Sequence, residues 1–353
     1  MNSNSDVTFI HESKILSPRQ KITIGLVGLV LVVLGAGAWY LWQMENAADD
    51  IVMNFGLEEE FAGDTSAIDN LYFDGALLTD PDHSAYIYKY DFDNKTATKA
   101  VSRSAIAYVK GNDLYNLALG YIGDTSDPDG LQPVWVDKVS GEIGAMVGVN
   151  GFNEREMASK NDKKHYAYAY QTAADSSYRE IENWNIAIHN YETGSVETIA
   201  AATKPQFMEN EDSLVYMTTA GIYKYNLTTK EKTPLFTVFQ NLSMFDDFAI
   251  SPDDRTLITT LPSINSISVA QLSEEGTFAE VGQIYTPNTR YYSPVVSSDS
   301  RLYGVVTLRD DEVGNLTGFN AEIRPLLHRS VVNQIELDSF DPETLELNIW
   351  TQE

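Results

Sequence analysis

The chain has 353 residues, a length that allows one large domain or two of ordinary size. With 43% hydrophobic and 11% aromatic residues it can form a sizeable core, which excludes a wholly disordered chain. A net charge of −27 repels phosphate backbones, so we expect no nucleic-acid partner. The absence of cysteine excludes disulfides, thiolate metal sites and cysteine nucleophiles.

The N-terminal region contains one long apolar segment, Ile22 to Trp42, without a charged residue. As a helix rising 1.5 Å per residue it spans a hydrocarbon core of about 30 Å. Lys14, Arg19 and Lys21 precede it, and the next basic residue is Lys89. Positive charge marks the cytoplasmic side. We therefore predict a single-pass membrane protein with residues 1–21 as a cytoplasmic tail, 22–42 as a transmembrane helix and the remainder outside, either periplasmic or at the cell surface.

Cleavage of this segment as a signal peptide is the alternative, because Ala36-Gly37-Ala38 has the small residues of a cleavage site. The aromatic cluster at Trp39, Tyr40 and Trp42 favours an interfacial belt instead. Residues 43–70 are rich in acidic side chains and are predicted to form a stalk. In this stalk Ile51, Val52, Phe55 and Leu57 are spaced as one face of a short amphipathic helix, and an acidic spacer is the simpler interpretation.

From residue 71 onward the sequence alternates between short apolar runs and turn residues, and it repeats itself. The run that begins Ile87-Tyr-Lys-Tyr-Asp aligns in register with Ile222-Tyr-Lys-Tyr-Asn, about three units of 45 residues further on. Similar runs begin at Ile186, Ile267, Val134 and Ile335. Each combines an alternating strand, a polar turn and a second strand, which predicts a β-hairpin.

A second repeated motif precedes most of the hairpins. Ser251-Pro-Asp-Asp-Arg-Thr-Leu257 is its clearest copy, and looser copies begin at Ser297, Glu209, Lys160 and Lys110. Proline presets φ at the second position of a turn, and aspartate can accept hydrogen bonds from the backbone ahead. The motif therefore predicts a chain reversal between two strands.

One such turn and one hairpin make a four-stranded antiparallel unit, and units of this kind pack around an axis as blades. These motifs resemble the TolB-type, WD40-like β-propeller repeat family, whose turn has glycine where this chain has Asp254. The resemblance implies an all-β fold, a β-propeller of about six blades over residues 71–353, with seven as the alternative count. It specifies a fold rather than a function.

The sequence contains few local motifs that indicate catalysis or metal binding. We find no zinc-protease motif, nucleophile elbow or phosphate-binding loop, so no catalytic residue and no cofactor is predicted. Asp124, Asp127 and Asp129 form a weak candidate calcium site, but Thr125 and Val136 stand where an EF-hand needs acids. Four Asn-x-Ser/Thr triplets, at Asn94, Asn226, Asn241 and Asn315, are close to the number expected by chance.

The longest break in the repeat is Arg309–Gln334, which we interpret as an exposed insertion. It carries Arg309, Arg324, His328 and Arg329, a concentration of cationic side chains in an acidic protein. We predict that these residues contribute to a partner-binding surface. The alternative is a hairpin that folds back on its own blade, with its arginines paired to neighbouring acids.

Together these features predict a membrane-anchored, extracytoplasmic propeller that acts as a non-catalytic binding or scaffold module in an envelope assembly. Its expected partners are the membrane, through Ile22–Trp42, and an envelope or surface protein. A propeller hydrolase, lactonase-like or peptidase-associated, is one alternative. An extracellular sensor that signals through a partner is another, because residues 1–21 contain no effector domain.

Overall fold

The structure is a computed structural model of the chain. It describes residues 57, 70–80, 85–99, 117–122, 132–137, 143–145, 152–160, 162, 164–173, 177, 179–190, 192–237, 241–311, 313–342 and 345–351. The chain divides into two units, Met1–Ile51 and Val52–Glu353. The tail and the predicted transmembrane helix 22–42 lie outside the described residues, and so does most of the stalk. Within the part that is described, no helix is long and apolar enough to cross a membrane.

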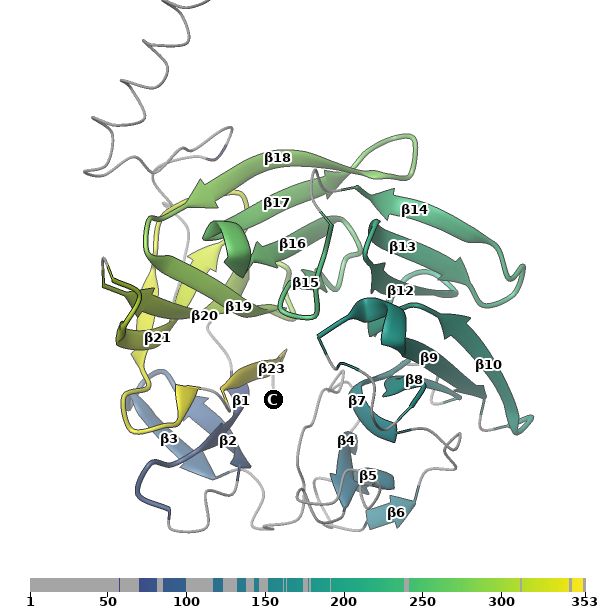
Figure 1. Ribbon diagram of the computed structural model, residues 1–353, viewed down its shortest axis with the longest axis horizontal. Coiled ribbons are helices and arrows are strands. Elements are labelled where there is room, and N and C mark those ends of the chain that lie inside the picture. Colours follow the sequence, from purple (N-terminus) through teal and green to yellow (C-terminus); the bar gives the residue numbers. More distant parts are fainter. Residues whose placement is uncertain are drawn as a thin grey trace, which may run out of the picture. The chain divides into compact units, whose positions relative to one another are not determined.

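The described residues form six antiparallel sheets, five of four strands and one of three, shown as successive blades in Figure 1. The first sheet joins β23 (Glu346–Thr351), β1 (Asn70–Ala76), β2 (Ala85–Asp91) and β3 (Thr96–Lys99), and the second joins β4 (Leu117–Ile122), β5 (Gln132–Asp137) and β6 (Ile143–Ala145). The third contains β7 (Phe152–Ser159), β8 (His165–Gln171), β9 (Trp184–Asn190) and β10 (Ser195–Ala200).

The remaining three sheets follow the chain in the same order. The fourth contains β11 (Thr203–Phe207), β12 (Ser213–Thr218), β13 (Gly221–Asn226) and β14 (Lys232–Phe236). The fifth contains β15 (Asp247–Ile250), β16 (Thr256–Leu261), β17 (Ser266–Leu272) and β18 (Phe278–Tyr285), and the sixth β19 (Thr289–Val296), β20 (Leu302–Asp310), β21 (Leu316–Pro325) and β22 (Asn333–Glu336). Two short 3₁₀ turns, η2 (Ile181–Asn183) and η3 (Pro262–Ile264), complete the described elements.

The predicted all-β propeller of about six blades is confirmed. In each sheet one edge strand contacts the edge strands of the neighbouring sheets, as β11 does with β7 and β15, and β19 does with β15 and β23. We call β7, β11, β15, β19 and β23 the inner strands, and count the strands of each sheet from them, because the inner strands of a propeller surround its central channel. The C-terminal strand β23 pairs with the N-terminal strand β1 in one sheet. The two ends of the propeller are thereby joined by backbone hydrogen bonds.

The core lies between consecutive sheets. Leu257 and Ile258 are adjacent on β16 and fully buried, yet they belong to two different apolar clusters. Successive side chains of a strand point to opposite faces, and both faces of a blade inside a propeller are covered by neighbouring blades. The strands β16 and β17 are therefore buried on both faces, with threonine and serine as well as apolar side chains in the interior.

The repeated hairpins and turns occupy equivalent places. The runs that begin at Ile87, Ile222, Ile186 and Ile267 form β2, β13, β9 and β17, the third strand of their sheets. The Ser251 turn connects β15 to β16, and the Ser297 turn connects β19 to β20. The copy at Lys110 lies outside the described residues.

The interpretation of Arg309–Gln334 as an insertion is wrong. This range contains β21, the third strand of the sixth sheet, which pairs with β20 from Leu302 to Asp310. The run beginning at Ile335, predicted to be equivalent to the other hairpins, instead starts near the end of β22, the fourth strand. The long β20–β21 hairpin continues the repeat, so deleting it would remove half of a blade.

Candidate functional site

The inner strands carry a layer of polar side chains at one repeated position. Each described turn between a first and a second strand begins with the same backbone hydrogen bond, donated by Lys160, Met208, Ser251 and Ser297 in consecutive sheets. Four residues before these donors stand Glu156, Lys204, Asp247 and Ser293. Glu156, Lys204 and Ser293 are structurally equivalent, since each lies at an irregularity in its strand pairing, whereas Asp247 pairs regularly with Thr260.

Three members of this layer form a shielded ion-pair cluster. The ammonium nitrogen of Lys204 lies 3.0 Å from Glu156 Oε1 and 3.3 Å from Asp247 Oδ2. The side chains of Lys204, Glu156 and Asp247 are 10%, 14% and 6% exposed, respectively. Glu156 Oε2 also accepts hydrogen bonds from Thr203 Oγ1 at 2.7 Å and from the Lys204 backbone at 2.8 Å. One lysine thus joins the inner strands of three consecutive blades.

The backbone at these positions is unusual. Glu156, Lys204 and Ser293 have φ values of 53°, 53° and 45°, in the left-handed region that residues other than glycine seldom adopt. Each coincides with a register shift against the next strand, which identifies a β-bulge. A bulge redirects a side chain out of the regular alternation, and strained residues gather where a structure holds a side chain in a required place.

Asp246 borders this layer and has a distinct environment. Its Oδ2 accepts hydrogen bonds from the backbone and hydroxyl of Ser243, at 2.7 and 3.0 Å, whereas its Oδ1 has no hydrogen-bond partner among the described residues. Burial raises the pKa of the Asp246 carboxyl group. A carboxyl group with a raised pKa is able to hold a proton closer to neutral pH, whereas Lys204 keeps Asp247 paired.

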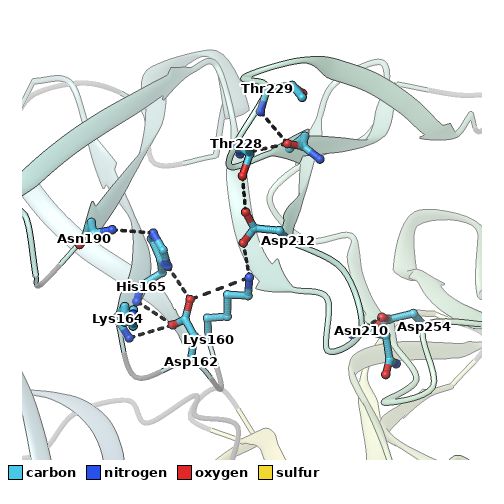
Figure 2. A network of polar contacts seen from close by, with 11 residues as sticks. Lys160, Asp162, Lys164, His165, Asn190, Asn210, Asp212, Thr228, Thr229 and Asp254 are labelled. Carbon is cyan, nitrogen blue, oxygen red and sulfur yellow. Dashed lines mark hydrogen bonds and ion pairs between the residues drawn. The ribbon is translucent and has the colours of Figure 1, made fainter.

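A second polar network connects the turns between the first and second strands, which we call the turn face (Figure 2). Lys160 forms an ion pair with Asp212 in the next blade, and Asp212 accepts a hydrogen bond from Thr228 at 2.7 Å. Asp162 lies 2.6 Å from His165 Nδ1, and the other ring nitrogen of His165 lies 2.9 Å from Asn190. This part of the network joins the third and fourth sheets.

The fourth and fifth sheets are joined by Asp254. This residue has φ 59°, which explains why the related turns have glycine here. Its carboxylate accepts the backbone N–H groups of Glu209 at 3.0 Å and Asn210 at 2.6 Å. Aspartate tolerates the left-handed conformation better than most residues and adds two hydrogen bonds between blades that glycine cannot make.

Glu209 is the most perturbed acid of the turn face. Burial, and then the negative charge of Asp254, raise its pKa to about 7. The turn face therefore contains a carboxyl group that changes charge near neutral pH, at a junction between two blades.

Of the residues predicted to bind a partner, Arg309 lies on β20 and Arg324 on β21, and His328 and Arg329 lie in the connection to β22. Arg324 is buried and bonds Glu322 at 2.7 Å, and Arg309, whose side chain is 49% exposed, lies 3.5 Å from the same carboxylate. Arg324 also donates to the backbone carbonyl of Arg329. Glu322 thus pairs with both arginines, as expected if this segment is a hairpin that folds back on its own blade. Whether Arg309, Arg324, His328 and Arg329 bind a partner stays a prediction.

The weak calcium candidate cannot be placed, because Asp124, Asp127 and Asp129 lie outside the described residues. Among the residues that are described, no group of three or more histidines and acids is arranged to hold a metal ion. Sequence reasoning missed the Glu156–Lys204–Asp247 cluster. Its available signal was a proline inside an inner strand, Pro205 after Lys204 and Pro294 after Ser293, because proline within a strand marks a bulge.

No protein-family model matches the chain, and no curated protein matches it either. Solved structures do match. TolB from Acinetobacter baumannii is 15% identical with a TM-score of 0.57, covering 82% of this chain and 68% of its own. The nidogen/laminin complex is 7% identical with a TM-score of 0.53, covering 80% of this chain and 97% of that one. At these identities the matches show the fold, a TolB-like β-propeller.

Proposed function

We propose that this chain is a single-pass membrane protein that presents a non-catalytic binding or scaffold propeller in an envelope assembly. Residues 1–21 are cytoplasmic, Ile22–Trp42 crosses the membrane, and the propeller lies outside. The charge asymmetry around Ile22–Trp42 supports the orientation, since basic residues precede it and acidic residues follow.

One structural observation carries the binding role. The ion-pairing groups of Glu156, Lys204 and Asp247 are occupied by one another across three inner strands. Charged groups that pair with one another across three strands hold those strands together, which favours a structural role for them. Binding then falls to the loops at the two ends of the blades, which are surface segments and the usual carriers of recognition on a rigid scaffold. Arg309 and Arg329 contribute to such a surface in this proposal.

The absence of cysteine allows a direct test of topology in intact cells. We would introduce one cysteine into the otherwise cysteine-free chain, as Ser5→Cys in the predicted tail or as Val313→Cys at an 82% exposed residue of the β20–β21 hairpin. A membrane-impermeant thiol reagent should label the Val313→Cys variant in intact cells and the Ser5→Cys variant only after lysis. Labelling of the Ser5→Cys variant in intact cells, or of neither variant before lysis, contradicts the proposed orientation.

The binding role is tested separately on the membrane-extracted protein. Cross-linking in cells followed by purification should recover a defined envelope protein, and Arg309→Ala should reduce its yield without changing the amount of propeller. Recovery of no envelope protein, together with ester or peptide hydrolysis by the purified chain, favours the hydrolase instead.

A further inference from the structure

One residue of the predicted stalk is part of the propeller core. Leu57 is 9% exposed and belongs to an apolar cluster formed by the fifth and sixth sheets. The members of this cluster from the fifth sheet include Ile258, Ile267 and Ile284, and those from the sixth include Tyr303 and Leu326. A simple spacer would leave such a side chain in water, whereas burial of its apolar surface favours the docked state.

Leu57 precedes the propeller repeats in sequence but packs inside the propeller. Leu57 precedes β1, which starts at Asn70 in the first sheet, yet it packs between the fifth and sixth sheets. The contact therefore joins segments that are about 200 to 270 residues apart in sequence. It does not belong to any blade, because the strands of both sheets are complete without it.

Charged residues of the sixth sheet lie beside the cluster that contains Leu57. On the sixth sheet two guanidinium groups, Arg309 and Arg324, share the carboxylate of Glu322. Tyr291 and Tyr303 of the cluster are close enough to Glu322 and Arg324 for these charges to affect their pKa values. In the sequence, Leu57 is followed directly by Glu58, Glu59 and Glu60.

We propose that the stalk docks on its own propeller through Leu57, at the interface of the fifth and sixth sheets. The occupant of this surface is the chain itself, held by the burial of Leu57 among Ile258, Ile267 and Tyr303.

Docking shortens the tether to the membrane, a consequence that rests on the proposed function. In the docked state the free segment runs from Trp42 to Leu57 instead of from Trp42 to Asn70, so it contains about half as many residues. At a maximum of about 3.5 Å per residue, the reach falls from roughly 95 Å to roughly 50 Å. The docked stalk thus holds the propeller nearer to the membrane.

The docking is tested on the full chain in detergent, again using the lack of cysteine. Leu57→Cys is compared with Leu78→Cys, a control at a 52% exposed leucine near the end of β1. In the native protein we expect a thiol reagent to modify the Leu57→Cys variant at least about tenfold more slowly than the Leu78→Cys variant. After denaturation the two variants should react at the same rate. Equal rates in the native protein overturn the proposal.

A second measurement covers the case in which cysteine itself loosens the contact. A glutamate-specific protease should cut the native chain slowly after Glu58–Glu60, and Leu57→Met should preserve this protection. Leu57→Asp should be cut faster there, because an aspartate is not buried without a partner. Identical cleavage patterns for Leu57→Asp and the natural chain contradict docking. Neither measurement depends on membrane insertion, so their failure is separate from a failure of the topology test.

Discussion

Replacing Lys204 by methionine is the sharpest test of the inner-strand layer. The substitution keeps most of the length of the side chain and removes the charge that pairs with the shielded carboxylates of Glu156 and Asp247. At an effective dielectric constant of about 20, charges 3.0 and 3.3 Å apart attract by about 5 kcal/mol each. Desolvation offsets most of this attraction, and losing one partner of a buried ion pair destabilises a protein by about 3–5 kcal/mol. We expect the lower end of this range, about 3 kcal/mol.

Urea unfolding measures the effect. With a denaturant slope of about 3 kcal/mol per molar, Lys204→Met should lower the midpoint by about 1 M. Lys164→Met is the matched control, because Lys164 also lies 3.0 Å from a carboxylate, Glu192, but these side chains are 47% and 59% exposed. An exposed pair contributes at most about 1 kcal/mol. Neutralising all three charges, with Glu156→Gln and Asp247→Asn added, should restore most of the stability. If Lys204→Met unfolds at the same urea concentration as Lys164→Met, the reasoning about the layer is refuted.

Three further predictions concern single residues. Asp254→Gly relieves the positive φ but removes two hydrogen bonds between blades, so we expect a net loss of about 1–2 kcal/mol in urea unfolding; a gain would show that only backbone conformation matters there. The raised pKa of Glu209, about 7, means that the folded state holds its proton more tightly than the unfolded state, so the contribution of this residue to stability is fully present below pH 4.5 and is lost as pH rises through 7; Glu209→Gln should flatten this part of the pH profile, worth about 1–2 kcal/mol after allowance for partial exposure. His189 is buried with its pKa lowered to about 4, so its contribution is present above pH 6.5 and is lost as pH falls toward 4; His189→Phe should remove this acid limb of the melting curve, and an unchanged limb would assign it to other groups.

The repeats predicted most of the fold because they depend on local chemistry. The Ser251 turn works through its own side chains, since Ser251 Oγ accepts the Thr256 N–H and Asp253 accepts the Arg255 N–H. Ser297 and Asp299 make the same contacts in the next blade. A motif whose hydrogen bonds close within six residues is visible in sequence.

The third strand of the sixth sheet was missed for a physical reason. One face of β21 carries Asn320, Glu322 and Arg324, all buried. They are satisfied by polar partners, Asn320 by Thr307 of β20 and the two charged residues by each other. These polar residues alternate with the apolar Phe319, Ala321 and Ile323, a pattern that predicts a strand with its polar face in water, whereas in the sixth sheet both faces of β21 are buried. The Lys204 cluster was missed because its members are far apart in sequence and each is an ordinary charged residue.

The junctions between blades show why the copies have diverged while the blade geometry is kept. On the turn face the third and fourth sheets are joined by Lys160 and Asp212, whereas Asp254 joins the fourth to the fifth through two backbone N–H groups. The fifth is joined to the sixth by a hydrogen bond from the Asp253 backbone to Ser300. Blades of one shape could pack in the wrong order if every junction were alike, because apolar contacts are tolerant. A charged pair, a carboxylate with two donors and a hydroxyl are not interchangeable, since a mismatched junction would leave polar groups unpaired. The divergence of the turn copies, which weakened the sequence signal, is therefore what distinguishes each junction from the others.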